Sequence, residues 1–170
     1  HPTTDDKLLL GQMYQALFET LEADPLCDPA KLLKAVRGMK DHPAMGSNIP
    51  YQAGGAVALA DRGIALDEAV ELARDALARS EKNPAFPYLE EDTSVDHDSV
   101  EGRKNRAEAM AYLHDALGWA LYKSGHTSEA RKELEKAYAD DPGEADNLYH
   151  LGQLARGAAD LKRAEKLFVE

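Results

Sequence analysis

The sequence predicts an all-α fold in which antiparallel helix hairpins, about eight helices in total, stack as a short superhelix. Ala, Leu, Glu, Lys and Arg dominate the chain, in blocks whose apolar residues recur every three or four positions. β-branched and aromatic residues cluster only in twos and threes, and strict alternation of apolar and polar residues never persists. The segments around Leu117-Gly118 and Leu151-Gly152 are also similar to each other at an offset of 34 residues, which is typical of arrays of helical hairpins.

The first helix is predicted over Thr4–Ala23. Thr3 or Thr4 can cap its N-terminus, and Asp5 and Asp6 favour the positive end of the helix dipole. We expect its buried stripe to consist of the residues that recur at helical spacing: Leu10, Tyr14, Leu17, Phe18 and Leu21.

Turn residues delimit the following helices. Asp28 is an N-cap and is followed by Pro29, whose missing N–H costs nothing in a first turn, and this second helix ends before Asp41. The third helix is predicted over Pro50–Arg62 and ends at Gly63. The remaining helices are predicted over Asp67–Lys82, Lys104–Ser124, Ser128–Ala139, Glu144–Arg156 and Asp160–Phe168.

One long stretch, residues 83–103, lacks helical periodicity and contains two prolines and six acidic residues. Weak Ca²⁺ or Zn²⁺ binding is conceivable here because His97 has carboxylates close to it: Asp92, Asp96, Asp98 and Glu101. The ligand order and the central glycine of an EF-hand are missing, however. Runs of like charge are usually solvated, so we expect a solvated acidic insertion, no metal site and no cofactor.

The unit that spans residues 111–144 carries a specific pattern of large and small residues. Its members are Leu117, Gly118, Leu121, Ala130, Leu134, Ala137 and Pro142. This pattern resembles that of the tetratricopeptide-repeat (TPR) family, although His114 stands where the family has tryptophan. The resemblance implies a right-handed superhelix in which Gly118 and Ala130 let the two helices of a hairpin approach closely.

Two further units resemble the same family. The next one, residues 145–170, matches at Leu151, Gly152, Ala164 and Phe168 and stops before its final alanine, from which we expect the parent protein to continue. An earlier, looser copy spans residues 51–84 and resembles a variant common in bacterial TPR proteins. The resemblance therefore covers residues 51–170. Residues 1–50 are expected to form an N-terminal helical layer, either a degenerate repeat or a cap.

The resemblance also implies a partner-binding groove, lined in TPR proteins by the first helix of each hairpin. The corresponding positions here are Tyr112, Asp115, Trp119, Tyr122 and Lys123, then Asp146, Tyr149, Gln153, Arg156 and Gly157, with Val57, Ala60 and Asp61 from the earlier copy. Aromatic rings beside a few charges suit an extended or helical peptide. Two arrangements remain open, because neighbouring helices could instead cover these rings as core.

Charge and cysteine content limit the remaining function classes. The net charge of −11 comes from 20 basic and 31 acidic residues, which opposes binding to nucleic acid or to an anionic membrane surface. No apolar run is long enough for membrane insertion. The single cysteine, Cys27, excludes an internal disulfide and fits either a cytoplasmic or a periplasmic location. The oligomeric state stays open.

The sequence favours a protein–protein interaction module, part of a larger bacterial protein, over an enzyme. Cys27 has no CxxC partner, and the chain lacks a G-x-S-x-G motif, a Walker loop and a dinucleotide-binding fingerprint. The alternative is a structural spacer or self-association domain that orients a fused enzymatic domain, for example a redox domain. The resemblance also allows an enzyme whose catalytic domain lies outside these residues.

Overall fold

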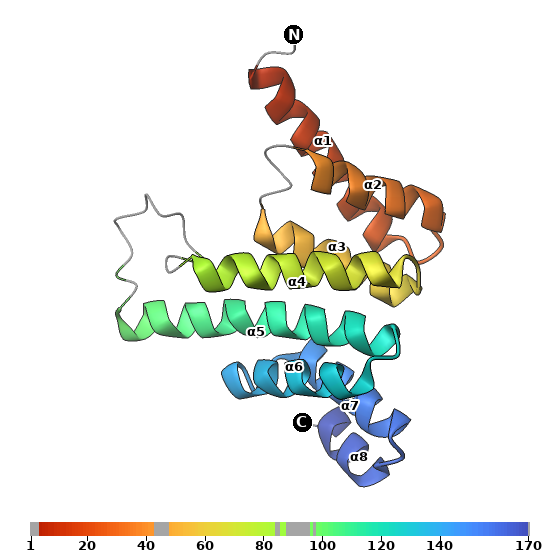
Figure 1. Ribbon diagram of the computed structural model, residues 1–170, viewed down its shortest axis with the longest axis vertical. Coiled ribbons are helices and arrows are strands. Elements are labelled where there is room, and N and C mark those ends of the chain that lie inside the picture. The colour runs from red at the N-terminus through yellow and green to blue at the C-terminus, as the bar shows by residue number, and fades with distance from the viewer. Residues whose placement is uncertain (1–3, 43–47, 84–85, 88–95, 97, 170) are drawn as a thin grey trace.

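The structure is a computed structural model that describes residues 4–42, 48–83, 86–87, 96 and 98–169, with side chains from Leu9 onward. These residues form an all-α fold without strands. Its helices are α1 (Thr4–Ala23), α2 (Pro29–Asp41), α3 (Ile49–Arg62), α4 (Leu66–Lys82), α5 (Val100–Lys123), α6 (Thr127–Asp140), α7 (Ala145–Gly157) and α8 (Leu161–Val169). Consecutive helices pair as four hairpins, which follow one another along the long axis of the molecule (Figure 1). The predicted TPR-like fold class is confirmed.

The boundary that differs most from its prediction is the start of α5. This helix begins at Val100 and not at Lys104, because the hydroxyl of Ser99 caps it by accepting a hydrogen bond from the N–H of Gly102 at 2.9 Å. Gly102 lowers helix propensity and hides this turn from the sequence pattern. The insertion is therefore shorter than predicted. His97 and Asp92, the basis of the conceivable metal site, lie outside the described residues.

Matching contacts in two successive hairpins confirm the repeat register. A Cβ added to Gly118 would lie 2.6 Å from Cγ of Leu134, so α5 and α6 can approach this closely only because position 118 is glycine. One repeat later, Gly152 faces Phe168 in the same way across α7 and α8. Two pairs of residues that are 34 positions apart, Gly118 with Leu134 and Gly152 with Phe168, thus make the same contact in successive hairpins.

Helices of neighbouring hairpins pack on each other through small residues. α5 contacts both α3 and α7, α4 packs against α5, and α2 packs against α3. A Cβ on Gly55 would lie 3.2 Å from Val36 of α2, and one on Gly54 would lie 3.4 Å from the hydroxyl oxygen of Tyr112 on α5. The two glycines thus allow close helix packing on both sides of α3. No helix in the described residues is both long enough and apolar enough to cross a membrane.

The predicted buried stripe of α1 is wrong at two positions. Phe18 is buried, and Tyr14 and Leu21 pack against the core, but Leu10 and Leu17 are exposed. The reason lies in the packing partners, because α1 contacts mainly α2 and extends beyond the other helices at one end of the molecule (Figure 1). Helical periodicity predicts which residues share a face, but not whether another helix covers that face.

The turns after α5 and α7 offer a matched pair of substitutions. Gly125 and Ala159 occupy equivalent positions one repeat apart, and both have a positive φ, 88° and 60° respectively. An L-residue with a side chain is strained in this region, by about 1–2 kcal/mol. Ala159→Gly relieves this strain in the folded state, but it also makes the unfolded chain more flexible, which partly offsets the gain. We expect the free energy of unfolding to rise by about 0.5 kcal/mol as the net effect. Gly125→Ala should lower it by about 1 kcal/mol, and urea denaturation of both variants would measure the two changes. Two changes of the same sign would contradict this account of the turns.

Candidate functional site

The predicted partner-binding residues gather on the adjacent first helices of the hairpins. We call this surface the binding face. It consists of Asp61 on α3, of Tyr112, Asp115, Trp119, Tyr122 and Lys123 on α5, and of Asp146, Tyr149, Gln153 and Arg156 on α7. Because α5 contacts both α3 and α7, the three helices that carry these residues lie side by side. Of the other predicted positions, Val57 is half-buried, Ala60 is buried and Gly157 lies under Tyr122.

Trp119 is enclosed by side chains from three helices and is only 5% exposed. Its ring stacks on that of His150 with centroids 4.0 Å apart and an angle of 12° between the planes, and it stacks less closely on Tyr122 at 5.5 Å. Its indole N–H donates a hydrogen bond of 2.7 Å to Oδ1 of Asp61 on α3. The ammonium group of Lys123 lies 5.1 Å from the ring centroid, within reach of a cation–π interaction. Of the two arrangements left open by the sequence, the covered one holds for this ring.

Asp115 is also buried, and it connects α5 to α7. Both of its carboxylate oxygens lie 3.0 Å from Nδ1 of His150, which must carry the proton because a carboxylate only accepts. Its Oδ1 also accepts a hydrogen bond of 3.0 Å from the amide of Asn147, which donates a second one to the carbonyl of Leu134 on α6. Hydrogen bonds satisfy this buried carboxylate, so it serves to fix helices and is not presented to a partner.

The remaining members of the binding face are at least partly accessible. Tyr112 is 42% exposed and Tyr149 is 49% exposed, and Asp146 and Arg156 are exposed beside them. The others are half-buried: Tyr122, Lys123 and Gln153. The hydroxyl of Tyr122 donates a hydrogen bond of 3.2 Å to the carbonyl of Gln153, which links α5 to α7 a second time. The face therefore has a fixed floor, Trp119 with its partners, and an accessible rim.

Carboxylates from several helices surround Tyr112. Burial raises the pKa of its phenol to about 12, and the negative charges of Glu22, Asp115 and Asp146 add to the rise. Although part of the ring is exposed, its hydroxyl lies against Gly54 of α3. The phenol therefore stays protonated at neutral pH.

Glu22 gives a pH-dependent prediction for this region. Its pKa is raised from 4.5 by burial, then by the charges of Asp61 and Glu19, while Arg62 acts in the opposite direction. The folded state therefore binds this proton more tightly than the unfolded state. The stability that Glu22 contributes is full below pH 4.5 and is lost as the pH rises through the raised pKa.

Glu22→Gln removes the repulsion of Glu22 by Asp61 and Glu19. It keeps the backbone carbonyl of residue 22, to which Arg62 donates a hydrogen bond of 3.0 Å. We expect the variant to be more stable than the wild type at pH 7, by about 0.5 kcal/mol or less because the side chain is exposed, and equal to it near pH 4. Urea denaturation at the two pH values measures this. A loss of stability at pH 7 would show that ionised Glu22 stabilises the fold.

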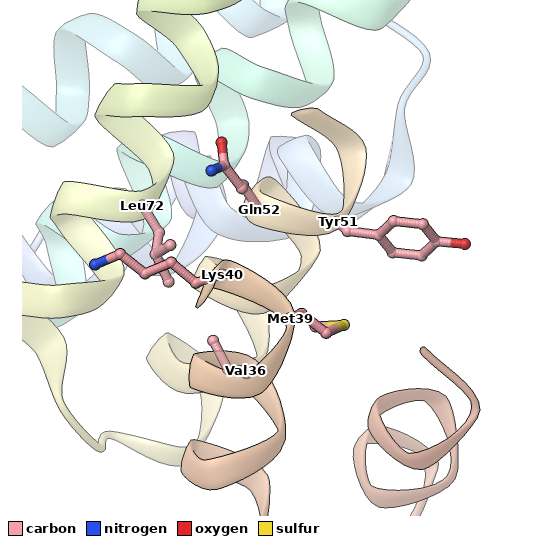
Figure 2. A pocket seen from close by; sticks show the side chains of 6 residues that line it. All are labelled: Val36, Met39, Lys40, Tyr51, Gln52 and Leu72. Atoms are coloured by element: carbon pink, nitrogen blue, oxygen red, sulfur yellow. The ribbon is translucent and has the colours of Figure 1, made fainter. Parts of the chain in front are cut away.

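Three hollows in the described structure differ in what they could hold. The one between α2, α3 and α4, lined by Val36, Met39, Lys40, Tyr51, Gln52 and Leu72, has a volume of about 10 Å³, enough for no more than one water molecule (Figure 2). Two larger ones, of about 220 and 210 Å³, lie at the two ends of the array, between α1 and α2 and between α7 and α8. The second of these is bordered by Tyr149, so the binding face continues into it.

No group of three or more metal-binding side chains forms within the part of the chain that the structure describes. His114 and His150 are both buried, each in a pair with a carboxylate. His114 pairs with Glu133 at 2.8 Å, and His150 pairs with Asp115. His114 and Asp115 are neighbours in the sequence but contact different partners, because consecutive residues of a helix point to different faces.

Sequence reasoning missed three residues of this site. Asn147 and His150 were not assigned to it, although they fix Asp115 and Trp119. Glu22 belongs to a segment for which no resemblance is recognised, so no repeat position pointed to it. The signal available in the sequence was a polar residue at a helix position that the apolar pattern marks as inward-facing. Asn147 and His150 are such residues, beside Leu148 and Leu151.

Comparisons with known proteins give limited further information. No family model matches the chain, and no curated protein matches it. Among solved structures, MamA from Desulfovibrio magneticus RS-1, from residue 41 to its end, is 19% identical, with 94% of this chain and 91% of that chain covered and a TM-score of 0.34. A second structure, the ArsTM double mutant of MamA RS-1, is 18% identical, with 94% and 90% covered and a TM-score of 0.35. At these low scores we derive the fold from the contacts within this chain.

Proposed function

We propose that this chain is a protein-interaction module of the TPR-like type, which binds a peptide segment of its partner along the binding face and has no catalytic activity of its own. The observation that carries this proposal is the pair of exposed tyrosines, Tyr112 on α5 and Tyr149 on α7, on one surface. A tyrosine provides a large contact area with few rotatable bonds, and aromatic residues are enriched where binding energy concentrates. Single exposed apolar residues are common, but two rings on adjacent helices form a surface for docking.

The floor beneath these rings supports the proposal because it is fixed before a partner arrives. A continuous chain of contacts runs through α3, α5 and α7. Asp61 accepts a hydrogen bond from Trp119, Trp119 stacks on His150, and His150 and Asn147 both bond to Asp115. Binding to such a surface orders few additional protein groups, which lowers the entropic cost of association. In this account Trp119 positions the exposed tyrosines and contacts the partner little.

Selection from a library of random 12-residue peptides displayed on phage, with the 170-residue chain as target, would test this proposal. We expect the selected peptides to bind at least tenfold more weakly to Tyr112→Ala and to Tyr149→Ala, the loss typical of a moderately important interface residue. Each tyrosine is a little less than half exposed, so both variants should lose only a small part of the stability of the wild type, and circular dichroism melts check that they are folded. Fluorescence anisotropy of labelled peptides gives the affinities.

Val100→Ala is the matched control, since Val100 is an exposed apolar residue at the start of α5, about 18 Å along the helix from Tyr112. It should leave the affinity unchanged. Peptides that bind equally well to all three variants would place the binding site elsewhere. A library that yields no peptide would favour a spacer.

A spacer or self-association domain is the second candidate, favoured by the exposed apolar residues at both ends of the array. On α1 they include Leu9 and Met13, and on α8 they include Phe168 and Val169. Stacking of hairpins from different copies would cover them. Sedimentation velocity over a hundredfold range of concentration separates the candidates, because self-association predicts a mass that rises with concentration.

A further inference from the structure

Carboxylates from three helices converge on the part of the binding face around Tyr112. A Cβ added to Gly54 of α3 would lie 3.4 Å from the hydroxyl of Tyr112 and 4.0 Å from the ring of Phe18, and Glu22 lies one turn after Phe18 on α1. Asp61 precedes Arg62, which bonds to the backbone carbonyl of Glu22, and Asp146 precedes Asn147, which bonds to Asp115 one turn after Tyr112. The charges of Glu22 and Asp146 accordingly raise the pKa of Tyr112, and the charge of Asp61 raises the pKa of Glu22. All three carboxylates are exposed. A partner that lies across Tyr112 therefore meets negative charge contributed by α1, α3 and α7 at once.

None of these three carboxylates forms an ion pair within the described residues, whereas several carboxylates on the second helices of the hairpins do. Glu68 pairs with Arg37, Glu129 with Arg74, and Glu135 with Arg131 and Arg163, for example.

Arg62, which follows Asp61 on α3, directs its guanidinium to the backbone carbonyls of Glu22, Asp24 and Pro25. Lys123 lies over the ring of Trp119. Neither cation forms an ion pair with any of the three carboxylates in the described residues, although the positive charge of Arg62 acts to lower the pKa of Glu22.

We infer that the binding face selects a peptide segment that carries lysine or arginine side chains, which lie across Tyr112 between Glu22, Asp61 and Asp146. This inference rests on the proposed function and names the chemistry of the partner. Two features of the site fit such a segment. Its cations pair with carboxylates that form no ion pair in the described residues, and they stack on an exposed tyrosine ring, whose face attracts positive charge.

The composition of the peptides selected from the random library is the first test. We expect lysine and arginine to be enriched over their frequency in the starting library, and aspartate and glutamate to be depleted. Selection at about 0.15 M salt screens long-range attraction to the net charge of −11, because the Debye length is then about 8 Å. Enrichment of acidic residues, or no charge bias at all, would overturn the inference.

A matched pair of double variants is the second test. Glu22→Gln with Asp146→Asn removes two charges from the binding face, and Glu71→Gln with Glu81→Gln removes two exposed, unpaired charges from α4. Both variants have the same net charge. We expect the first to weaken binding of a selected basic peptide about fivefold, as two exposed ion pairs would, and the second to change it less than twofold. Circular dichroism melts check that both variants are folded.

Failure of the inference is distinguishable from failure of the proposed function. Equal losses in the two double variants would mean that only the net charge attracts the peptide, and the inference would be wrong. Selected peptides that need Tyr112 and Tyr149 but ignore Glu22 and Asp146 would likewise overturn the inference alone. Peptides insensitive to the tyrosines, or the absence of any selected peptide, would overturn both.

Discussion

Replacement of Trp119 with alanine is expected to lower the free energy of unfolding by about 3–5 kcal/mol, the usual cost of truncating a large buried aromatic residue. The ring is 5% exposed, stacks on His150 and Tyr122, and donates a hydrogen bond to Asp61. Its removal leaves a cavity between α5 and α7. Because Trp119 is the only tryptophan, urea denaturation of the variant is followed by circular dichroism.

Trp119→Phe is the control for this substitution. Phenylalanine can keep the stacking on His150 but cannot donate a hydrogen bond to Asp61. We therefore expect a clearly smaller loss of unfolding free energy than in Trp119→Ala, of which the missing hydrogen bond accounts for about 1 kcal/mol. If Trp119→Ala melts like the wild type, the ring is not part of the core. In that case its place on the binding face would be that of an exposed anchor for the partner.

Replacement of Gly118 with leucine is expected to cost about 3 kcal/mol, the upper end of the range for overpacked cores, or more. Even the first added carbon would lie 2.6 Å from Cγ and 3.0 Å from the backbone nitrogen of Leu134, so α6 must move away from α5. This is the most extensively packed hairpin, and α7 rests on α6. Thermal and urea denaturation both measure the loss.

Two other glycines calibrate the Gly118 result. Gly143 lies in the turn between α6 and α7, with only Asp141 within 4 Å of an added Cβ, so Gly143→Leu should change stability by about 0.5 kcal/mol or less. The stability loss of Gly152→Leu should lie between those of Gly118→Leu and Gly143→Leu. Its neighbour Phe168 lies on α8 and is 46% exposed, so this ring can move aside more easily than Leu134. If Gly118→Leu proves no worse than Gly143→Leu, the register of the α5–α6 hairpin is wrong.

The repeated pattern is local, and for that reason it predicted the fold well. Gly118 and Leu134 recur as Gly152 and Phe168, and the two pairs make the same contact. Spacing within one hairpin determines that contact, so no knowledge of distant residues was needed. The start of α5 escaped prediction because its cap, Ser99, precedes a glycine within the first turn.

The site could be predicted only in part, because its character depends on residues far apart in the sequence. Repeat position placed Trp119 and Asp115 on the first helix of a hairpin, where they lie, but it could not show that both are covered. That depends on His150, which stacks on Trp119 and bonds to Asp115, and on Asp61, which lies 58 residues before Trp119. The contribution of Glu22 requires the N-terminal hairpin to pack beside α3, which no motif in that segment predicted.

Mapping of backbone amide shifts by NMR tests the central claim, that a partner segment docks on the binding face, most directly. A peptide selected from the library would be titrated into the isotopically labelled chain. We expect the largest shifts at Tyr112, Tyr149 and Asp146, and small ones on α4. Shifts confined to the ends of the array, at Leu9 and Met13 or at Phe168 and Val169, would contradict the claim and place the docking site at an end of the array.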